Sequence, residues 1–460
     1  QALEQVHAGA TDGVSGQIAA HYEQASLAAA AIRYYRQAAH VARRLYANQE
    51  ASQQLEKGLA LLASLPQAPA QIQQTLEFQM ELAAILMDTK GWASPEAEEA
   101  YARALALCQQ AEKTAELFPV LWGLHEVYLF QARHEPARLM AEQCLELAER
   151  LQDPDLLLQA HHALWGVLFH LSPNELPLAL TYTREGIARY VAEQHHVHTF
   201  HYGGHDPGLC CRQVAAKACW LLGYPDQALT YSQEALDLGR QLNHPFSLAF
   251  ILNNTASVYL FYRETASVTE LTTNAIRIST ERNFSMLLTE AQIFHGWAKA
   301  MQGETESGIM QIRQGITEWI KLGVLLDLPH FWILLAEACT KAGQLEEALT
   351  AIGESLTATY ASGERYLEAE AYRIQGELLL ATGQTAEAAE RTYAQALAVA
   401  REQKAKMLEL RTAVSLSRLW QQQGKQPQAR QLLAEVYGWF TEGFDTVDLQ
   451  EARALLVALG

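Results

Sequence analysis

Several patterns that mark common protein classes are missing from this 460-residue sequence. Its six cysteines, at 108, 144, 210, 211, 219 and 339, include no C-x-x-C pair, so we expect reduced, buried thiols. No apolar run approaches the roughly 18 to 20 residues of a membrane span, and Gln1 opens no signal-peptide pattern. We therefore expect a cytoplasmic protein that does not enter a membrane.

Basic residues are also scarce. Lys and Arg number 34 against 52 Asp and Glu, which gives a formal net charge of -18. Sequence-independent binding to the phosphates of nucleic acid needs clustered Lys and Arg. We therefore expect no direct contact with nucleic acid. The sequence contains no phosphate-binding G-x-x-x-x-G-K-[ST] loop, no G-x-S-x-G elbow and no H-E-x-x-H helix. It therefore predicts neither an enzyme nor a bound cofactor.

The most informative feature that is present is a repeat of about forty residues. Small residues recur at intervals of 40 to 42, apart from one interval of 49. A fixed period of this length is typical of stacked helix-turn-helix units. We predict an all-α, right-handed superhelical solenoid, whose repeats are marked by Ala97, Ala137, Ala179, Ala228, Val268, Gly308, Ala348, Ala388 and Ala429.

Turn and cap residues accompany this period. A turn residue lies five positions before most of the small residues, at Asn174, Gly223, Gly303, Gly343, Gly383 and Gly424. Ser94, Asp153 and Asp206 each precede proline, which predicts a capped helix start. Ser172 and Glu175 have the spacing of a capping box. The turn residues, the cap residues and the forty-residue period therefore predict the same helix boundaries.

One repeat shows the resemblance to a known family. Gly223, Ala228, Tyr231, Ala235 and Leu236 follow the order of turn, small and aromatic residues that resembles the tetratricopeptide repeat (TPR). The period is near 40 residues instead of about 34. This longer form is similar to the C-terminal sensor arrays of bacterial signal-transducing ATPases and of maltose-activator-type regulators.

Two further stretches resemble the helical region that follows predicted AAA-type ATPase modules, often joined to class III nucleotide cyclases. They are His21-Tyr22-Glu23-Gln24-Ala25 and the segment 201–208. The resemblance implies that residues 1–70 form an irregular helical region that couples to an upstream ATPase domain. Residues 71–460 would form the repeat array, with an inserted His/Gly-rich loop at 193–207.

The inserted loop, which accounts for the interval of 49 residues, allows three interpretations. The histidines could bind metal through His195, His198, His201 and His205, with Cys210 or Cys211 as a further ligand. The loop could instead fold over the concave face and contribute to a ligand pocket. Finally, its glycines could form a turn before Asp206, leaving the histidines solvated or hydrogen-bonded to the loop backbone. The pocket residues in the second interpretation would be His201, Tyr202, His205 and Arg212.

The concave face of such an array is lined by the first helix of each repeat. We expect its polar side chains to be exposed and available to a ligand. The predicted function is a protein- or peptide-binding module, acting as sensor or scaffold of a larger signalling ATPase or transcriptional regulator. Alternatives are a metal-binding protein or metal-dependent enzyme centred on the His-rich loop, and a passive assembly scaffold. The concave face would present Gln213, Lys217, Asn253, Asn254, Ser257, Glu290, His330 and Glu337.

The tryptophans have a simpler interpretation. Most of them lie in predicted first helices among apolar residues, which favours core packing over an aromatic cage. The tryptophans predicted to lie in the core are Trp122, Trp165, Trp220, Trp297, Trp332 and Trp420.

Overall fold

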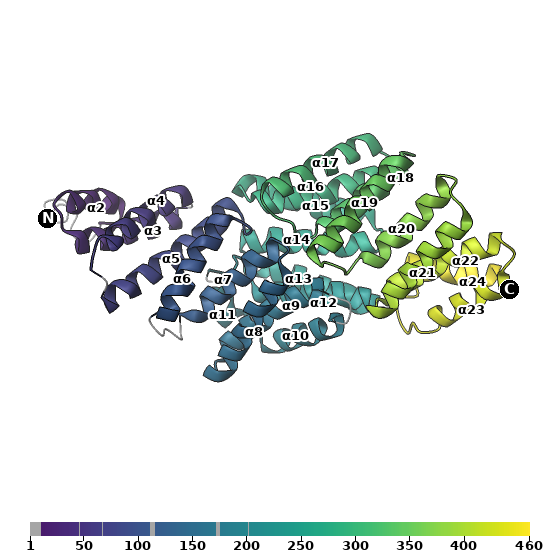
Figure 1. Cartoon of the computed structure of the whole chain (residues 1–460), viewed down its shortest axis with the longest axis horizontal. Coiled ribbons are helices and arrows are strands. Elements are labelled where there is room, and N and C mark those ends of the chain that lie inside the picture. Colours follow the sequence, from purple (N-terminus) through teal and green to yellow (C-terminus); the bar gives the residue numbers. More distant parts are fainter. Residues whose placement is uncertain (1–10, 46, 67, 111–115, 172–174, 201) are drawn as a thin grey trace. The chain divides into compact units, whose positions relative to one another are not determined.

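Every regular element in the described part of the chain is a helix (Figure 1). The computed structural model describes all residues except 1–10, 46, 67, 111–115, 172–174 and 201. The predicted all-α superhelical solenoid of TPR-like repeats is confirmed. None of the described helices combines the length and the apolar character that crossing a membrane requires.

The chain divides into two compact units. The first comprises residues 1–130 together with 201–203. Its described helices pack in sequence, each mainly against the next. They are η1 (Asp12–Val14), α2 (Ser15–Gln24), α3 (Ala28–Arg44), α4 (Asn48–Ala63), α5 (Pro69–Lys90), α6 (Pro95–Gln110) and α7 (Leu117–Phe130).

The second unit comprises residues 131–200 and 204–460. It begins with α8 (His134–Leu151), α9 (Pro154–Leu171), α10 (Leu176–Arg189), α11 (Ala192–His195) and η2 (His196–Phe200). The regular array follows as α12 (Pro207–Leu221), α13 (Pro225–Leu242), α14 (Pro245–Phe261), α15 (Thr265–Arg282), α16 (Ser285–Met301), α17 (Thr305–Lys321), α18 (Leu328–Lys341), α19 (Leu345–Ser362), α20 (Glu368–Ala381), α21 (Ala386–Glu402), α22 (Lys406–Gln422), α23 (Gln426–Tyr437) and α24 (Val447–Ala458).

Each repeat of the second unit is a pair of helices joined by a tight turn. The first helices, α12, α14, α16, α18, α20 and α22, are called the inner helices below. Each inner helix packs against its partner, and most also contact the inner helix of the next repeat. The small residues lie where the partners approach. At Gly308, for example, an added Cβ would lie 2.4 Å from the carbonyl oxygen of Gly296. Only glycine therefore fits there without movement of the backbone.

The other small residues of the period are fully buried, with one exception. Ala388 is partly exposed, and its neighbour Ala389 is fully buried instead. The prediction for this position was therefore wrong by one residue. The reason is local, because Thr385 caps α21 and accepts a hydrogen bond from the amide of Ala388 at 3.3 Å. That cap sets the start of α21 and turns Ala389 toward the core.

The predicted turns and caps are confirmed where the structure describes them. Gly223, Gly303, Gly343, Gly383 and Gly424 all have positive φ angles, which favour glycine. The side chains of Ser94, Asp153 and Asp206 each accept a hydrogen bond from a backbone amide of the helix they precede. Asn174 and Ser172 lie outside the described residues.

The tryptophan prediction is confirmed for four residues. Trp122, Trp165, Trp220 and Trp297 are buried, with exposed fractions of 3% or less. Trp332 and Trp420 are partly exposed. The indole of Trp420 keeps a polar contact, since its Nε1 donates to Glu390 at 2.9 Å.

The last repeat of the second unit folds back onto the turn between α12 and α13. Glu442 accepts hydrogen bonds from the backbone amides of Asp226 at 2.9 Å and Gln227 at 3.1 Å. In return, the amide of Gly443 donates to the carboxylate of Asp226 at 3.1 Å. The ring of Trp439 lies against Tyr224, with centroids 5.6 Å apart. Residues more than 200 positions apart in sequence are therefore in contact, and we call this contact the fold-back below.

Candidate functional site

Polar side chains of successive inner helices are joined into a ladder. Lys217 Nζ donates to Asn254 Oδ1 at 3.1 Å, and Asn253 Nδ2 donates to Glu290 Oε2 at 2.9 Å. Further along, just before the inner helices α18 and α20, the backbone amide of Asp327 donates to Glu364 at 3.1 Å. The partners in each of these pairs are 37 residues apart. The ladder therefore connects neighbouring repeats at one recurring spacing.

The expectation that these side chains are exposed is wrong. Gln213, Lys217, Asn253, Asn254 and His330 are all buried, and His330 is 4% exposed. The physical reason is that the inner helices pack against one another. In addition, α22 contacts α12, so the last part of the array also covers the first inner helix. Ser257 and Glu290 are likewise buried. Ligand binding by these residues remains a prediction, and a ligand would have to enter a packed interior.

Burial shifts the protonation of this interior. It raises the pKa of Glu290 to about 7, with Asp327 adding to the effect and Lys217 opposing it. It also lowers the pKa of His330 to about 4, although Asp327 acts in the opposite direction. Burial therefore favours the uncharged forms of Glu290 and His330.

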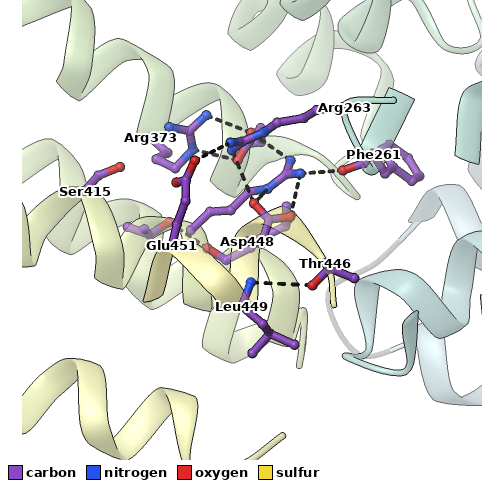
Figure 2. Close-up of polar contacts among 12 residues, drawn as sticks. Phe261, Arg263, Arg373, Ser415, Thr446, Asp448, Leu449 and Glu451 are labelled. Carbon is purple, nitrogen blue, oxygen red and sulfur yellow. Dashed lines mark hydrogen bonds and ion pairs between the residues drawn. The ribbon is translucent and has the colours of Figure 1, made fainter. Parts of the chain in front are cut away.

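A charged cavity lies at the C-terminal end of the same inner face. Its volume is about 210 Å³. Figure 2 shows the side chain of Arg263 directed toward Asp448 and Glu451 of α24, whereas Arg373 pairs with Glu370 and Glu377 of its own helix, α20. Four arginines and five carboxylate residues take part, counting Glu370 beside the lining. The lining consists of Arg263, Glu337, Arg373, Glu377, Arg411, Val414, Ser415, Arg418, Asp448 and Glu451.

Arg411 is the centre of this cavity's ion-pair network. Its guanidinium donates to both carboxylate oxygens of Asp448 at 2.9 Å, which is a bidentate pair. It also donates to Glu370 at 3.2 Å and to the carbonyl oxygen of Phe261. The guanidinium carbon lies 4.7 Å from the ring centre of Trp220. Arg411 thus joins α12, the end of α14, α20 and α24.

Here the buried carboxylates are compensated. Burial alone would raise the pKa of Glu370, but Arg373 and Arg411 lower it to about 2. Glu337 differs, because burial and the nearby Glu370 raise its pKa above the ordinary value. Its oxygen accepts a hydrogen bond from Trp297 Nε1 at 2.7 Å.

The rim of the cavity is more open than its centre. Arg418 is paired with Glu451 at 3.2 Å, and their side chains are 50% and 37% exposed. Arg263, which is 34% exposed, lies 3.6 Å from the same carboxylate. Two arginines therefore share one accessible carboxylate. Exposed pairs of this kind contribute little to stability.

The described part of the His-rich insertion packs on α9 and also contacts the inner helices α12 and α14. It contains α11 and η2, and its histidines contact side chains three or four residues apart on α9. His195 Nε2 lies 3.2 Å from Asp155, and His198 Nδ1 lies 2.9 Å from the amide of Gln159. Both histidines are buried, so they are not solvated, but His195 does bond to backbone, since its Nδ1 accepts from the amide of Val191 at 2.8 Å.

The predicted pocket residues of the insertion are divided between the two units, and the ligand pocket remains a prediction. His205 is buried against α9, whereas Tyr202 belongs to the first unit and lies against Phe118 and Trp122. Arg212 donates to the carbonyl oxygen of Gly208 and lies 3.4 Å from Glu234. His201, a member of both predicted sites, lies outside the described residues.

Two other groups of possible metal ligands exist among the described residues. The first, His162, His205 and Cys210, contains one histidine of the predicted metal site; His195 and His198 take no part in it. The second group joins His170 to Asp327 and Glu364. In that group, His170 Nδ1 and Glu364 Oε1 are 3.5 Å apart.

Sequence reasoning missed Arg411, Arg373, Arg263 and Arg418. The signal that could have found Arg411 is the spacing of 37 residues to Asp448, which is shared by the other rungs of the ladder. This spacing is three residues shorter than the repeat. It links a position on one inner helix to a position almost one turn earlier on the next.

The helix pairs and their fold class define the chain as a TPR-like helical repeat protein. No family profile matches the sequence. An uncharacterized protein of Rhizobium meliloti (strain 1021) is 25% identical over 412 residues, which are 88% of this chain and 39% of that protein. The chain thus spans about two fifths of this curated relative's length.

Among the solved structures that the chain resembles, one supports the fold. The Rap protein complexed with competence and sporulation factor has a TM-score of 0.50 at 12% identity, over 76% of this chain and 97% of that one. A signal transduction ATPase with numerous domains and a TPR sensor, from Pyrococcus horikoshii, has a TM-score of 0.43 at 13% identity, over 84% of this chain and 55% of that one.

Proposed function

We propose that this chain is a protein- or peptide-binding helical repeat module that serves as sensor or scaffold of a larger signalling ATPase or transcriptional regulator. The observation that carries the proposal is the charged cavity, where four arginines from several repeats line one opening. Arginine guanidinium groups bind carboxylates in a bidentate geometry, as Arg411 already does with Asp448.

The size of the cavity favours part of a polymer over a complete cofactor. Its volume of about 210 Å³ is below the roughly 300 to 1,000 Å³ of pockets that enclose small molecules. One or two side chains, or a chain end, fill such a space. We therefore infer a ligand peptide that inserts a carboxylate between Arg263 and Arg418.

The rim pairs make this exchange energetically feasible. Glu451 already occupies the position between Arg263 and Arg418, but all three side chains are partly exposed. Because such pairs are weak, a ligand carboxylate can replace Glu451 at little cost. The replaced residue lies on α24, only three positions from Asp448, which Arg411 holds. Binding at the rim would thereby change the contacts of α24.

This coupling supports the sensor interpretation. A ligand shifts an equilibrium only through a difference in affinity for two states, and the position of α24 supplies two such states. An attached domain could respond to that shift. The alignment with the Rhizobium meliloti relative covers 39% of that protein's length, which is compatible with a role inside a longer protein.

Selection of peptides against the purified chain tests the proposal. A random peptide display library is selected on the wild type and then compared on an Arg263→Ala/Arg418→Ala double variant. Arg391→Ala, an exposed arginine on α21, is the matched control. We expect peptides that need both rim arginines and lose affinity when their carboxylate is amidated. Peptides that bind the wild type and the double variant equally would place binding elsewhere.

Scattering separates a sensor from a passive scaffold. Small-angle X-ray scattering of the chain with and without a selected peptide should reveal a change in the dimensions of the array. Unchanged dimensions at saturating peptide would favour the passive scaffold.

A further inference from the structure

The group formed by His162, His205 and Cys210 is distinct from the charged cavity. It joins α9, the end of the His-rich insertion and the first turns of α12. The exposed fractions of the three residues are 3%, 3% and 7%. One donor atom of each residue lies within 4.8 Å of the donor atoms of the other two. Two imidazoles and one thiol therefore converge at a largely buried position.

The hydrogen bonds around His162 orient its ring for coordination. Gln159 Nε2 lies 2.9 Å from His198 Nδ1, and Gln159 Oε1 lies 3.2 Å from His162 Nδ1. The amide oxygen can only accept, so His162 carries its proton on Nδ1. Its Nε2 lone pair then faces His205 Nε2 at 3.0 Å. Metal-binding histidines commonly have this arrangement, with the second ring nitrogen donating to an oxygen.

The separations are near those of a tetrahedral zinc site. With Zn–N bonds of about 2.0–2.1 Å and a Zn–S bond of about 2.3 Å, two nitrogens lie about 3.3 Å apart and a nitrogen and a sulfur about 3.5 Å. The two Nε2 atoms, at 3.0 Å, need to separate by only a few tenths of an ångström. The Cys210 sulfur lies within 4.8 Å of both nitrogens and needs to approach them by at most about 1.3 Å.

The surroundings of the sulfur also fit a thiolate. Trp165 Nε1 lies 3.3 Å from Cys210 Sγ and donates a hydrogen bond to it. Such a donor stabilises negative charge on a coordinated sulfur. Asp206, which follows His205 in the chain, is fully buried. Its carboxylate accepts hydrogen bonds from Tyr190 and the amide of Gly208 and lies 3.0 Å from His196 Nδ1, so it is held by partners other than the three proposed ligands.

We propose that His162, His205 and Cys210 bind a Zn²⁺ ion that fastens the His-rich insertion between α9 and α12. Imidazole and thiolate are the ligands that Zn²⁺ prefers, whereas Mg²⁺ and Ca²⁺ prefer oxygen. Water completes the fourth position. On binding, Zn²⁺ replaces the thiol proton of Cys210, which passes to solvent, and the proton between the two imidazoles moves to Nδ1 of His205, so that both Nε2 atoms coordinate as neutral imidazoles. The proposal does not depend on the peptide-binding function.

Metal binding is tested on the full chain, purified without a histidine tag and treated with chelator. Zn²⁺ alone is titrated against a chromophoric competitor, and thermal unfolding is recorded with and without the ion. We expect one Zn²⁺ per chain and a higher melting temperature. Cys210→Ser should weaken binding by more than about a hundredfold, since changes to surrounding hydrogen bonds alone cost ~10–100-fold. Cys144→Ser, a buried thiol of α8, is the matched control and should bind as the wild type does.

Cobalt substitution makes the test independent of whether the variant folds. Co²⁺ added to the unaltered protein should give the near-ultraviolet charge-transfer band of a cobalt–thiolate bond. The band should persist in Cys144→Ser. A wild-type protein that binds no Zn²⁺, or a Co²⁺ complex without this band, would overturn the proposal. Binding by Cys210→Ser at wild-type affinity would overturn it as well.

Discussion

Glu290 and Glu370 lie on inner helices of the same array, yet burial has opposite outcomes for them. Glu290 has an amide and a single lysine nearby, and its pKa rises to about 7. Glu370 lies between Arg373 and Arg411, and its pKa falls to about 2. Both side chains are less than one tenth exposed. The comparison teaches that the arginines near α24 decide where this interior keeps charge, because the depth of burial is similar at both sites.

Removing Arg411 should have the largest effect on stability, because Arg411 helps to keep Glu370 charged while Glu290 has no such partner. Arg411→Met keeps much of the side-chain length but leaves Glu370 and Asp448 with less compensation. We expect the free energy of unfolding to fall by about 3–5 kcal/mol, as when one partner of a buried ion pair is lost. Chemical denaturation measures the change. Arg418→Met, at the exposed rim of the same helix, is the control, and an equal loss for both variants would contradict this account.

Substituting Trp220 tests the packing of the indole ring that Arg411 contacts. The indole is fully buried and stacks on Phe261, with ring centroids 4.7 Å apart. Trp220→Ala should destabilise the protein by about 3–5 kcal/mol through the lost contacts and the cavity left behind. Thermal and chemical unfolding measure it, with the partly exposed Trp332→Ala as control. An unchanged melting curve would mean that Trp220 does not support the array.

The two glutamates also predict opposite dependences on pH. Folding raises the pKa of Glu290, so its protonated form stabilises the protein at low pH, and this contribution is lost as pH rises from about 4.5 to about 7. Folding lowers the pKa of Glu370, so its contribution is present above about 4.5 and is lost as pH falls toward about 2. Each contribution is on the order of 3 kcal/mol.

Unfolding measured between pH 2 and pH 8 checks both signs. Glu290→Gln should flatten the upper part of the stability profile, and Glu370→Gln the lower part. Glu354→Gln, on the exposed side of α19, controls for the lost charge. If Glu290→Gln left the slope between about pH 4.5 and pH 7 unchanged, Glu290 would be ionised in the folded state as it is in the unfolded one.

The smallest effect on the free energy of unfolding is expected at the rim of the charged cavity. Arg418→Ala should change the free energy of unfolding by less than about 1 kcal/mol, because its pair with Glu451 is half exposed. A double-mutant cycle with Glu451→Ala measures the coupling between the two residues. A coupling of several kcal/mol would make the rim as rigid as the centre and would leave no carboxylate that a ligand could replace.

The sequence predicted the features that are local to one repeat. Glycine at a turn, a cap before proline and a small residue every forty positions each act within one helix pair, and the structure contains them. Even the error at Ala388 is local, since Thr385 shifts the helix start by one residue. Side-chain periodicity is sufficient for such features because each repeat packs mainly on its neighbours.

The sequence did not predict the burial of the inner face or the charged cavity. Both depend on the angle between successive repeats, which accumulates over the array and brings Glu442 to Asp226. No local pattern encodes that angle. The contacts of the His-rich insertion could not be predicted for a related reason. Its partners Asp155, Gln159 and His162 belong to α9, a helix from an earlier repeat.

The fold-back also limits how this array can evolve. Repeat proteins commonly gain and lose units because each unit contacts only its neighbours. Here the segment around Glu442 and Gly443 must return to Asp226 and Gln227, so the number of units between them is set by the return. Duplicating or deleting one unit would separate these residues by the width of a helix pair. The length of this part of the chain is therefore a structural requirement, comparable to the fixed blade number of a closed propeller.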